Sequence, residues 1–480
     1  MGSPAPVPDA NGDVPAICHT PPGPVSSSAK YIVLLIAVLA GFITPFDGSA
    51  VNIALPSIGA EFHMDAIALS WIATAYLLAA AVLLVPIGKI ADIYGRKRIF
   101  LYGIMLFTLA SFLITMVPTT ELLILVRIIQ GFGGAMIYGT GIAILTSVFP
   151  PQERGKALGI YITAVYFGLT LGPFLGGLLT EYFGWRSIFF VNVPLGILAC
   201  ILIIGRLDGE WAECAGERFD LTGSLIYAAA LVALMYGFSL VPDSTGIVLV
   251  LAGIAAMVLF GLFEMKVATP VLDMRLLTRN RVFAFSNLAA LINYSATFAV
   301  TFLLSLDLQY TRGFSPEQAG IILLVQPAVM ACVSPVAGRL SDRIDSQIVA
   351  SAGMGLTATS LLLLSFISAS TTLAYIIACL VICGVGLALF SSPNVNAIMG
   401  AVEKRYYGVA SGMNGTMRLV GQMLSMGIAM MLFSLIIGRV EITPEYYPQL
   451  ITSLRYAFIL FTIFCIVGLI ASLMRGKKQV

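Results

Sequence analysis

Two charged residues stand inside long apolar segments of the sequence. Asp47 lies deep in the apolar run that begins at Tyr31, and Arg127 interrupts the run "LILVRIIQGFGGA". A charge at the centre of a bilayer costs about 2.5–3.5 kcal/mol on insertion scales, and it persists where it faces a polar cavity or a partner. Burial favours the neutral form of a carboxyl group. Asp47 is therefore a candidate to exchange a proton and to attract a cation. The alternative is a structural acid bonded to backbone or to Asn52.

Arg127 is the natural partner for this acid. At about 1.5 Å of rise per residue, Asp47 and Arg127 both fall in the outer half of their segments, close enough in depth to interact directly or through water. Arginine hardly deprotonates, so Arg127 would act by stabilising a charged acid and promoting proton release. The alternative is an anchor that bonds helix ends and carbonyl groups. Asn52 and Gln130 complete this candidate group.

Two further charged residues are candidates for coupling or substrate contact. Arg418 lies in "NGTMRLVGQ", four residues before Gln422, so the two share a helix face. Arg418 either lines a cavity or packs. Asp307 falls at the outer rim of its segment, where it either recruits cations or, the favoured interpretation, is simply solvated.

The composition of the chain is that of a membrane protein. The chain has 480 residues, of which 59% are hydrophobic and 10% are charged, whereas soluble domains carry about 25% charge. A net charge of +2 does not provide the basic surface that nucleic-acid binding needs. A membrane-spanning helix needs about 20 apolar residues. By that rule fourteen spans are predicted: 31–57, 68–91, 98–117, 121–148, 154–180, 186–205, 221–241, 246–267, 282–306, 316–338, 347–368, 373–399, 407–437 and 452–474.

Charge distribution and internal repeats predict how the spans are arranged. Twenty Lys and Arg residues fall in segments on one side and four on the other, which predicts cytoplasmic termini. "GKIAD" at 88–92 recurs as "GRLSD" at 338–342, and "GKALG" at 155–159 as "GVASG" at 408–412. Such a duplication is typical of transporters with a solute site between two halves. The predicted domains are a disordered tail (1–29), a six-helix half (30–205), an inserted helix pair with loops (206–281), a second six-helix half (282–474) and a cytoplasmic tail (475–480).

Four segments resemble signatures of the major facilitator superfamily, and specifically of its fourteen-helix drug/proton antiporter group. They are "GKIADIYGRKR" (88–98), "LILVRIIQGFGGA" (123–135), "GLTLGPFLGG" (168–177) and "WRSIFFVNVPLG" (185–196). "FDGSAVNIALP" (46–56) is similar to the first-span signature of that group. The resemblance implies an all-α polytopic membrane protein with the major facilitator fold. It also implies an indirect role in proton transfer for Arg127.

The resemblance also implies residues that gate the transport path. In the second loop these are Gly88, Asp92, Gly95, Arg96 and Lys97, and charge contacts of Asp92 and Arg96 would lock the cytoplasmic sides of the two halves together. Small residues permit close helix packing, and proline breaks a backbone hydrogen bond. The candidates for a hinge or a seal against proton leak are Gly168, Gly172, Pro173, Gly176 and Gly177; plain packing is the alternative.

The cavity is expected to combine aromatic and amide side chains, because aromatic faces hold flat or cationic molecules. The candidates are Phe46, Tyr76, Tyr138, Asn293, Tyr294, Phe298, Gln326, Asn396 and Asn414.

The favoured function is proton-coupled export of lipophilic, cationic compounds by alternating access in the cytoplasmic membrane. The expected partners are protons, a small lipophilic substrate and the lipid bilayer, with no nucleic acid, and the protein is expected to be a monomer. No cofactor or metal is expected, the proton being the coupling ion. The first alternative is a narrow-specificity metabolite transporter of the same fold. A polytopic membrane enzyme is less favoured, because His19 and His63 both lie outside the apolar runs.

Overall fold

The computed structural model describes residues 27–475 apart from 208, 213–216, 218, 268–269, 273 and 403–406. The predicted tail over 1–29 therefore lies outside the described residues except at its end, where the first helix already begins at Ser27. Of the predicted C-terminal tail, only Arg475 is described.

Within the described ranges, fourteen helical segments are long and apolar enough to cross a membrane, as the sequence predicts. The ninth span is divided into α10, α11 and the π-helical turn η1, and the tenth into α12 and α13. The helices are α1 (Ser27–Phe62), α2 (Ala66–Tyr94), α3 (Arg96–Ile114), α4 (Thr120–Val148), α5 (Pro151–Phe183), α6 (Arg186–Arg206), α7 (Leu221–Leu240), α8 (Ser244–Glu264), α9 (Met274–Arg279), α10 (Arg281–Thr297), α11 (Ala299–Leu306), η1 (Asp307–Thr311), α12 (Pro316–Leu323), α13 (Val325–Arg343), α14 (Ser346–Leu364), α15 (Leu373–Gly400), α16 (Tyr407–Ile436), the short 3₁₀ turn η3 (Pro444–Tyr446) and α17 (Tyr447–Leu473).

Local chemistry accounts for the break in the tenth span and for the π-helical turn in the ninth. Pro327 has no N–H to donate to the carbonyl of Leu323, which is where α12 ends. At η1, the backbone N–H of Arg312 bonds to the carbonyl of Asp307, five residues earlier. The Arg312 guanidinium also bonds to the Asp307 carboxylate at 2.7 Å, so a side-chain contact supports the wider turn.

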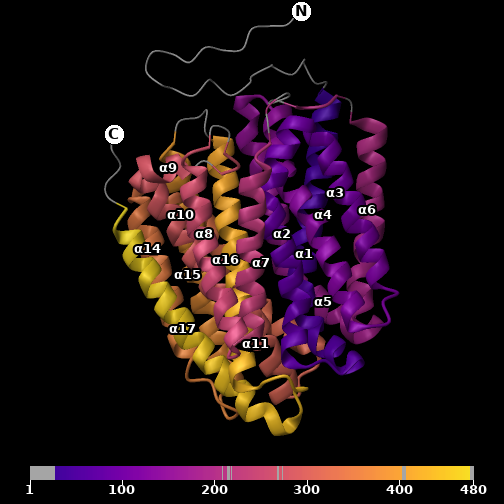
Figure 1. Ribbon diagram of the computed structural model, residues 1–480, viewed down its shortest axis with the longest axis vertical. Helices are drawn as coiled ribbons and strands as arrows, with labels where there is room; N and C mark the ends of the chain where they lie inside the picture. Colours follow the sequence, from indigo (N-terminus) through magenta and orange to yellow (C-terminus); the bar gives the residue numbers. More distant parts are fainter. Residues whose placement is uncertain are drawn as a thin grey trace, which may run out of the picture.

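The helices form two bundles with a pair of helices beside their junction. Helices α1–α6 pack on one another, as do α10–α17, while α7 packs on α8 and also contacts α2 and α16. Figure 1 shows the first bundle in indigo and purple on the right, the second in orange and yellow on the left, and α7 between them. The start of α1 and the end of α17 lie at the same end of the molecule (Figure 1), as an even number of spans requires.

At the other end of the molecule, which the charge distribution assigns to the outside, the two bundles are in contact. Gln309 donates to the carbonyl of Ile53 at 2.9 Å, and the Tyr182 hydroxyl donates to Glu317 at 3.1 Å. The backbone of α5 approaches that of α12 so closely that a Cβ on Gly177 would overlap the carbonyl oxygen of Pro316. These contacts hold the outer ends of the bundles together.

Helices α1 and α5 pack backbone to backbone through a row of glycines. A Cβ on Gly168 would lie 2.6 Å from the carbonyl oxygen of Phe42, and one on Gly176 would lie 2.8 Å from the Cα of Ala50. The Ser49 hydroxyl donates to the carbonyl of Gly168 across the same contact. The close approach that small residues permit in membranes therefore joins α1 directly to α5.

We expect Gly176→Ala to destabilise the protein and Gly159→Ala to leave it unchanged. The new methyl at Gly176 meets backbone, which cannot rotate away, and overpacking of this kind costs about 1–3 kcal/mol. Gly159 lies on the same helix with nothing within 4 Å of the new Cβ. Thermal unfolding of the purified variants in one detergent measures both effects. Equal midpoints for the two variants would show that the α1–α5 contact tolerates a methyl.

Candidate functional site

The carboxylate of Asp47 is fully buried within the first bundle, with 0% of the residue exposed. One oxygen, Oδ2, accepts from Arg127 Nη1 at 2.6 Å. The other, Oδ1, accepts from Gln130 Nε2 at 3.1 Å and from Asn192 Nδ2 at 3.0 Å. Three donors on α4 and α6 therefore fix the position of the α1 carboxylate.

Arg127 is fixed from several sides. It is 1% exposed. Its Nε donates to the carbonyl of Ile72 on α2 at 3.1 Å, and its Nη1 also donates to Gln130 Oε1 at 2.5 Å. The guanidinium lies 4.5 Å from the ring centre of Tyr76 and 5.6 Å from that of Phe189. Cation–π contacts strengthen when desolvated, so aromatic faces replace part of the lost hydration.

Gln130 connects the ion pair to a second layer of polar groups. Its amide donates both to Asp47 and to the hydroxyl of Ser111 on α3 at 2.9 Å, and Ser111 donates to the carbonyl of Phe107. Sequence reasoning identified Asp47, Arg127 and Gln130 but missed Asn192 and Ser111. The signal for Asn192 was available, because it is an amide inside the apolar run "IFFVNVPLG".

Hydrogen bonds surround the ion pair on most sides. Desolvation costs several kcal/mol per ion, and the attraction compensates only when geometry is good and the remaining polar atoms are bonded. All but a few atoms of this group meet that condition: the hydroxyl of Tyr76 and Oδ1 of Asn192 are buried without a hydrogen-bond partner.

A cavity lies between the two bundles. Helices α1 and α5 line it from the first bundle, and α10, α11, α13, α15 and α16 from the second. Apolar groups alternate with amides and hydroxyls. The lining residues are Ser49, Asn52, Tyr166, Leu169, Thr170, Pro173, Asn293, Tyr294, Thr297, Phe298, Thr301, Gln326, Pro327, Met330, Leu387, Ser391, Arg418 and Gln422.

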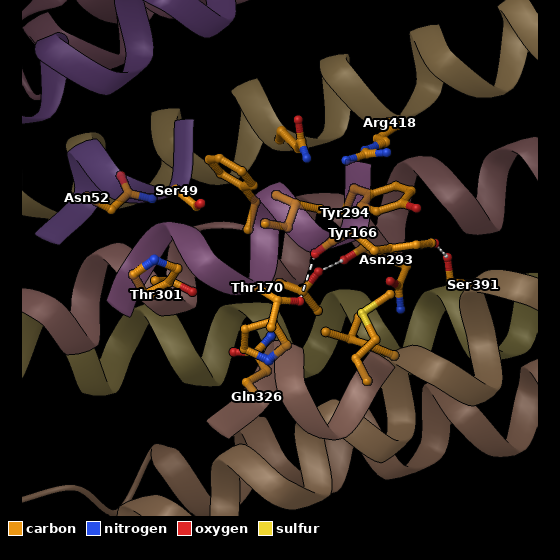
Figure 2. Close-up of a pocket in the computed structure, with 18 residues that line it drawn as sticks. Ser49, Asn52, Tyr166, Thr170, Asn293, Tyr294, Thr301, Gln326, Ser391 and Arg418 are labelled. Atoms are coloured by element: carbon orange, nitrogen blue, oxygen red, sulfur yellow. Dashed lines mark hydrogen bonds between the residues drawn. The ribbon is translucent and has the colours of Figure 1, made fainter. Parts of the chain in front are cut away.

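Arg418 is the one charged side chain among the described residues that line this cavity. Its guanidinium carbon lies 5.7 Å from the ring centre of Tyr294. Figure 2 shows Arg418 and Tyr294 at one end of the cavity and Asn52 and Ser49 at the other. The Tyr166 hydroxyl is hydrogen-bonded to Ser391 at 3.1 Å, which joins α5 to α15 across the cavity.

The predicted cavity residues divide into two groups. Asn293, Tyr294, Phe298 and Gln326 line the cavity, as do Asn52 and Arg418 from the coupling candidates. The remaining candidates lie elsewhere: Phe46 stacks on Phe42, Tyr76 lies against Arg127, Tyr138 packs into the hydrophobic core, Asn396 donates to Ser341 near the inner end of α13, and Asn414 is partly buried on α16.

Asp307 does not have the solvated position that the sequence favoured. The residue is 0% exposed and forms an ion pair with Arg312 at 2.7 Å. Arg312 also donates to the carbonyls of Thr371 and Ser368. The helix continues through η1 and folds the arginine back over the acid, which excludes water from the carboxylate. Asp307 is not among the residues that line the cavity.

Comparison with known proteins identifies the family. The model of the Major Facilitator Superfamily matches residues 37–263 and 287–479. The chain belongs to the major facilitator superfamily. It is therefore an integral protein of the cytoplasmic membrane that transports small molecules, and it is not an enzyme. The predicted fold of this superfamily is confirmed.

Relatives within the superfamily differ in cargo. The riboflavin transporter RibZ of Clostridioides difficile is 34% identical over 81% of this chain and 85% of its own length. The multidrug resistance protein Stp of Mycobacterium tuberculosis is 32% identical over 83% of this chain and 75% of its own. A bacterial homologue of the lysosomal transporter Spinster, solved inward-facing and unoccupied, shares the fold with a TM-score of 0.65 at 17% identity, covering 95% of this chain and 100% of its own.

The superfamily loop between α2 and α3 is fastened within the first bundle. Gly95 has a φ of +117°, a backbone angle that residues with a side chain rarely adopt. This angle lets α3 start directly after α2. Arg96 bonds to Asp92 at 2.7 Å and to Ser147 on α4 at 2.6 Å. Lys97 donates to the carbonyl of Leu207 after α6. At Gly88, an added Cβ would have no other atom within 4 Å. A lock between the two halves through Asp92 and Arg96 remains a prediction.

We expect the two members of the buried ion pair to depend on one another for stability. Removing one partner of such a pair leaves an uncompensated buried charge and costs about 3–5 kcal/mol. Arg127→Gln and Asp47→Asn should each lower the unfolding midpoint, and the double variant should lose less than the sum. Thermal unfolding in detergent provides this cycle. Strict additivity would mean that the two side chains are energetically independent.

Proposed function

We propose that this transporter exports lipophilic compounds in exchange for protons, and that Asp47 is the group whose protonation couples the two movements. One observation carries the proposal: a fully buried carboxylate in a membrane-spanning helix is balanced by a single arginine, Arg127. Acids in such positions mark ion and proton paths. Among the described residues, the other buried acid with an arginine partner is Asp307, which lies at the outer closure and is not among the residues that line the cavity.

Protonation would act on the contacts of the ion pair. A proton on Asp47 removes its charge and weakens the bond to Arg127, which keeps its bonds to Ile72 and Gln130. Release of the proton restores the pair. The structure has its bundles joined at the outer end and its carboxylate paired, which agrees with a state in which the proton has left to the inside.

Helix α1 provides the link between the proton site and the cavity. Asp47, Ser49 and Asn52 lie on this one helix, and the latter two line the cavity. The glycine contacts with α5 prevent α1 from moving alone, so a shift at Asp47 carries both helices. We propose that the halves over 30–205 and 282–474 rock about this cavity, in a monomer. Pro173 and Gly177 lie against α12 and would form the contact between the halves, while Gly168, Gly172 and Gly176 keep α5 joined to α1.

Relatives support export of lipophilic compounds. The multidrug resistance protein Stp and the tetracenomycin C resistance and export protein of Streptomyces glaucescens, 28% identical over 90% of this chain and 81% of its own, are both named for resistance. The riboflavin transporter RibZ supports the alternative, a narrow-specificity metabolite transporter. A cavity lined by amides as well as apolar groups suits either cargo.

We expect Asp47→Asn to reduce substrate-driven proton movement at least about tenfold, because an amide cannot bind and release the proton. Purified protein in liposomes with an imposed pH gradient is supplied with lipophilic cations, neutral planar drugs and riboflavin, and lumenal pH is followed. Asp307→Asn is the matched control: it also removes a buried, arginine-paired acid, but it should retain coupling.

The outcomes separate the candidate acids. Coupling that survives in Asp47→Asn and is lost in Asp307→Asn would transfer the role to Asp307. Proton movement that no compound elicits in the wild type would reject proton exchange, and movement with riboflavin alone would favour the narrow-specificity alternative.

A further inference from the structure

The charge of the cavity points to a substrate class that differs from the one the sequence suggested. Arg418 makes no hydrogen bond or ion pair with the described residues, and its guanidinium carbon lies 5.7 Å from the ring centre of Tyr294. No aspartate or glutamate is among the described residues that line the cavity. The buried carboxylate of Asp47, in the first bundle, is already bound by Arg127, Gln130 and Asn192. The cavity therefore has an uncompensated positive charge.

A cation without a counterion in a membrane interior is costly. Desolvation of an unpaired charge costs several kcal/mol unless an opposite charge and hydrogen bonds replace the water. Arg418 differs in this respect from Arg127, whose charge is balanced by Asp47. The guanidinium fork matches planar oxygen anions with two parallel hydrogen bonds, so a ligand with such a group would satisfy Arg418.

The rest of the lining indicates the body of that ligand. Phe298, Leu169 and Met330 provide apolar surface, and Tyr294 presents a ring beside the guanidinium. Asn293 has both amide atoms buried without a partner, and Oε1 of Gln326 is also unpartnered. Unbonded buried amides are costly, and polar groups on the ligand would satisfy them.

We propose that the cavity binds amphipathic anions: compounds with an apolar, planar aromatic body and a carboxylate or ionised phenol that bonds to Arg418. The proposal rests on the assignment of this cavity as the substrate site. The sequence suggested that Asp47 attracts a cationic substrate. In this proposal Arg418 attracts an anionic substrate, and Asp47 serves only to bind and release the proton. The aromatic body lies against Tyr294 and Phe298, and the amides of Asn293 and Gln326 bond to further polar atoms.

Equilibrium binding to the purified protein in detergent tests the proposal without a gradient and without transport. The probes are three coumarins of similar size, substituted at one position with a carboxylate, a carboxamide or a trimethylammoniomethyl group, and a matched naphthalene set. We expect the carboxylates to bind wild type about tenfold more tightly than the carboxamides, because hydrogen bonds to a charged partner are the stronger ones, and the cations to bind most weakly.

Three variants identify the origin of the preference. Arg418→Gln should bind carboxylate and carboxamide equally, while Arg418→Lys, which keeps the charge without the fork, should retain part of the preference. Gln422→Glu places an acid four residues from Arg418 on the same face and should remove the preference for carboxylates without removing the arginine. Thermal unfolding shows that each variant is folded.

Several results would overturn the proposal: a preference for the cationic probes in wild type, equal binding of all three, no binding of either carboxylate, or a carboxylate preference that persists in Arg418→Gln. The proton experiment fails independently. An absence of substrate-driven proton movement in the wild type, with the carboxylate preference intact, would reject proton exchange and keep the anion site. Proton coupling through Asp47 without a carboxylate preference would reject the anion site and keep Asp47 as the coupling group.

Discussion

The buried ion pair between Asp47 and Arg127 requires helices α1 and α4 to stay packed together in the membrane. Asp47 and Arg127 lie on α1 and α4, and neither charge is exposed. Each ion is costly alone in an apolar medium. The two helices must therefore keep the side chains of Asp47 and Arg127 within hydrogen-bonding distance of one another. The bonds from Asn192 on α6 and to Ile72 on α2 extend this requirement to most of the first bundle.

The same requirement shapes the cavity. Helix α1 is held at Asp47 by the ion pair and along its length by the glycines of α5, so its cavity-facing residues Ser49 and Asn52 have a position set by the proton site. The second bundle contributes the opposite wall and Arg418. Two arginines thus have different roles: Arg127 is neutralised within the protein, whereas Arg418 is left for a ligand.

The sequence predicted the fold well because membrane insertion depends on local properties. Apolar length gave fourteen spans, and the depth of Asp47 and Arg127 in their spans suggested that they interact. Features that depend on which way a side chain faces were less accessible. Tyr76 and Phe46 were expected in the cavity, but they face into the first bundle. Tyr166 and Thr170 line the cavity and were missed, since nothing in the pattern of an apolar helix marks its cavity face. Asp307 was expected in solvent, because a fold-back by Arg312 five residues later cannot be read from periodicity.

Proton exchange through Asp47 requires its buried carboxylate to change protonation. Infrared difference spectra of the protein in lipid, recorded on acidification in wild type and Asp47→Asn, detect this change. We expect a protonated-carboxyl C=O band that appears on acidification in wild type, is absent from Asp47→Asn, and diminishes when a transported compound is added. A band of equal size in the variant would assign the proton to another group and rule out Asp47 as the coupling residue.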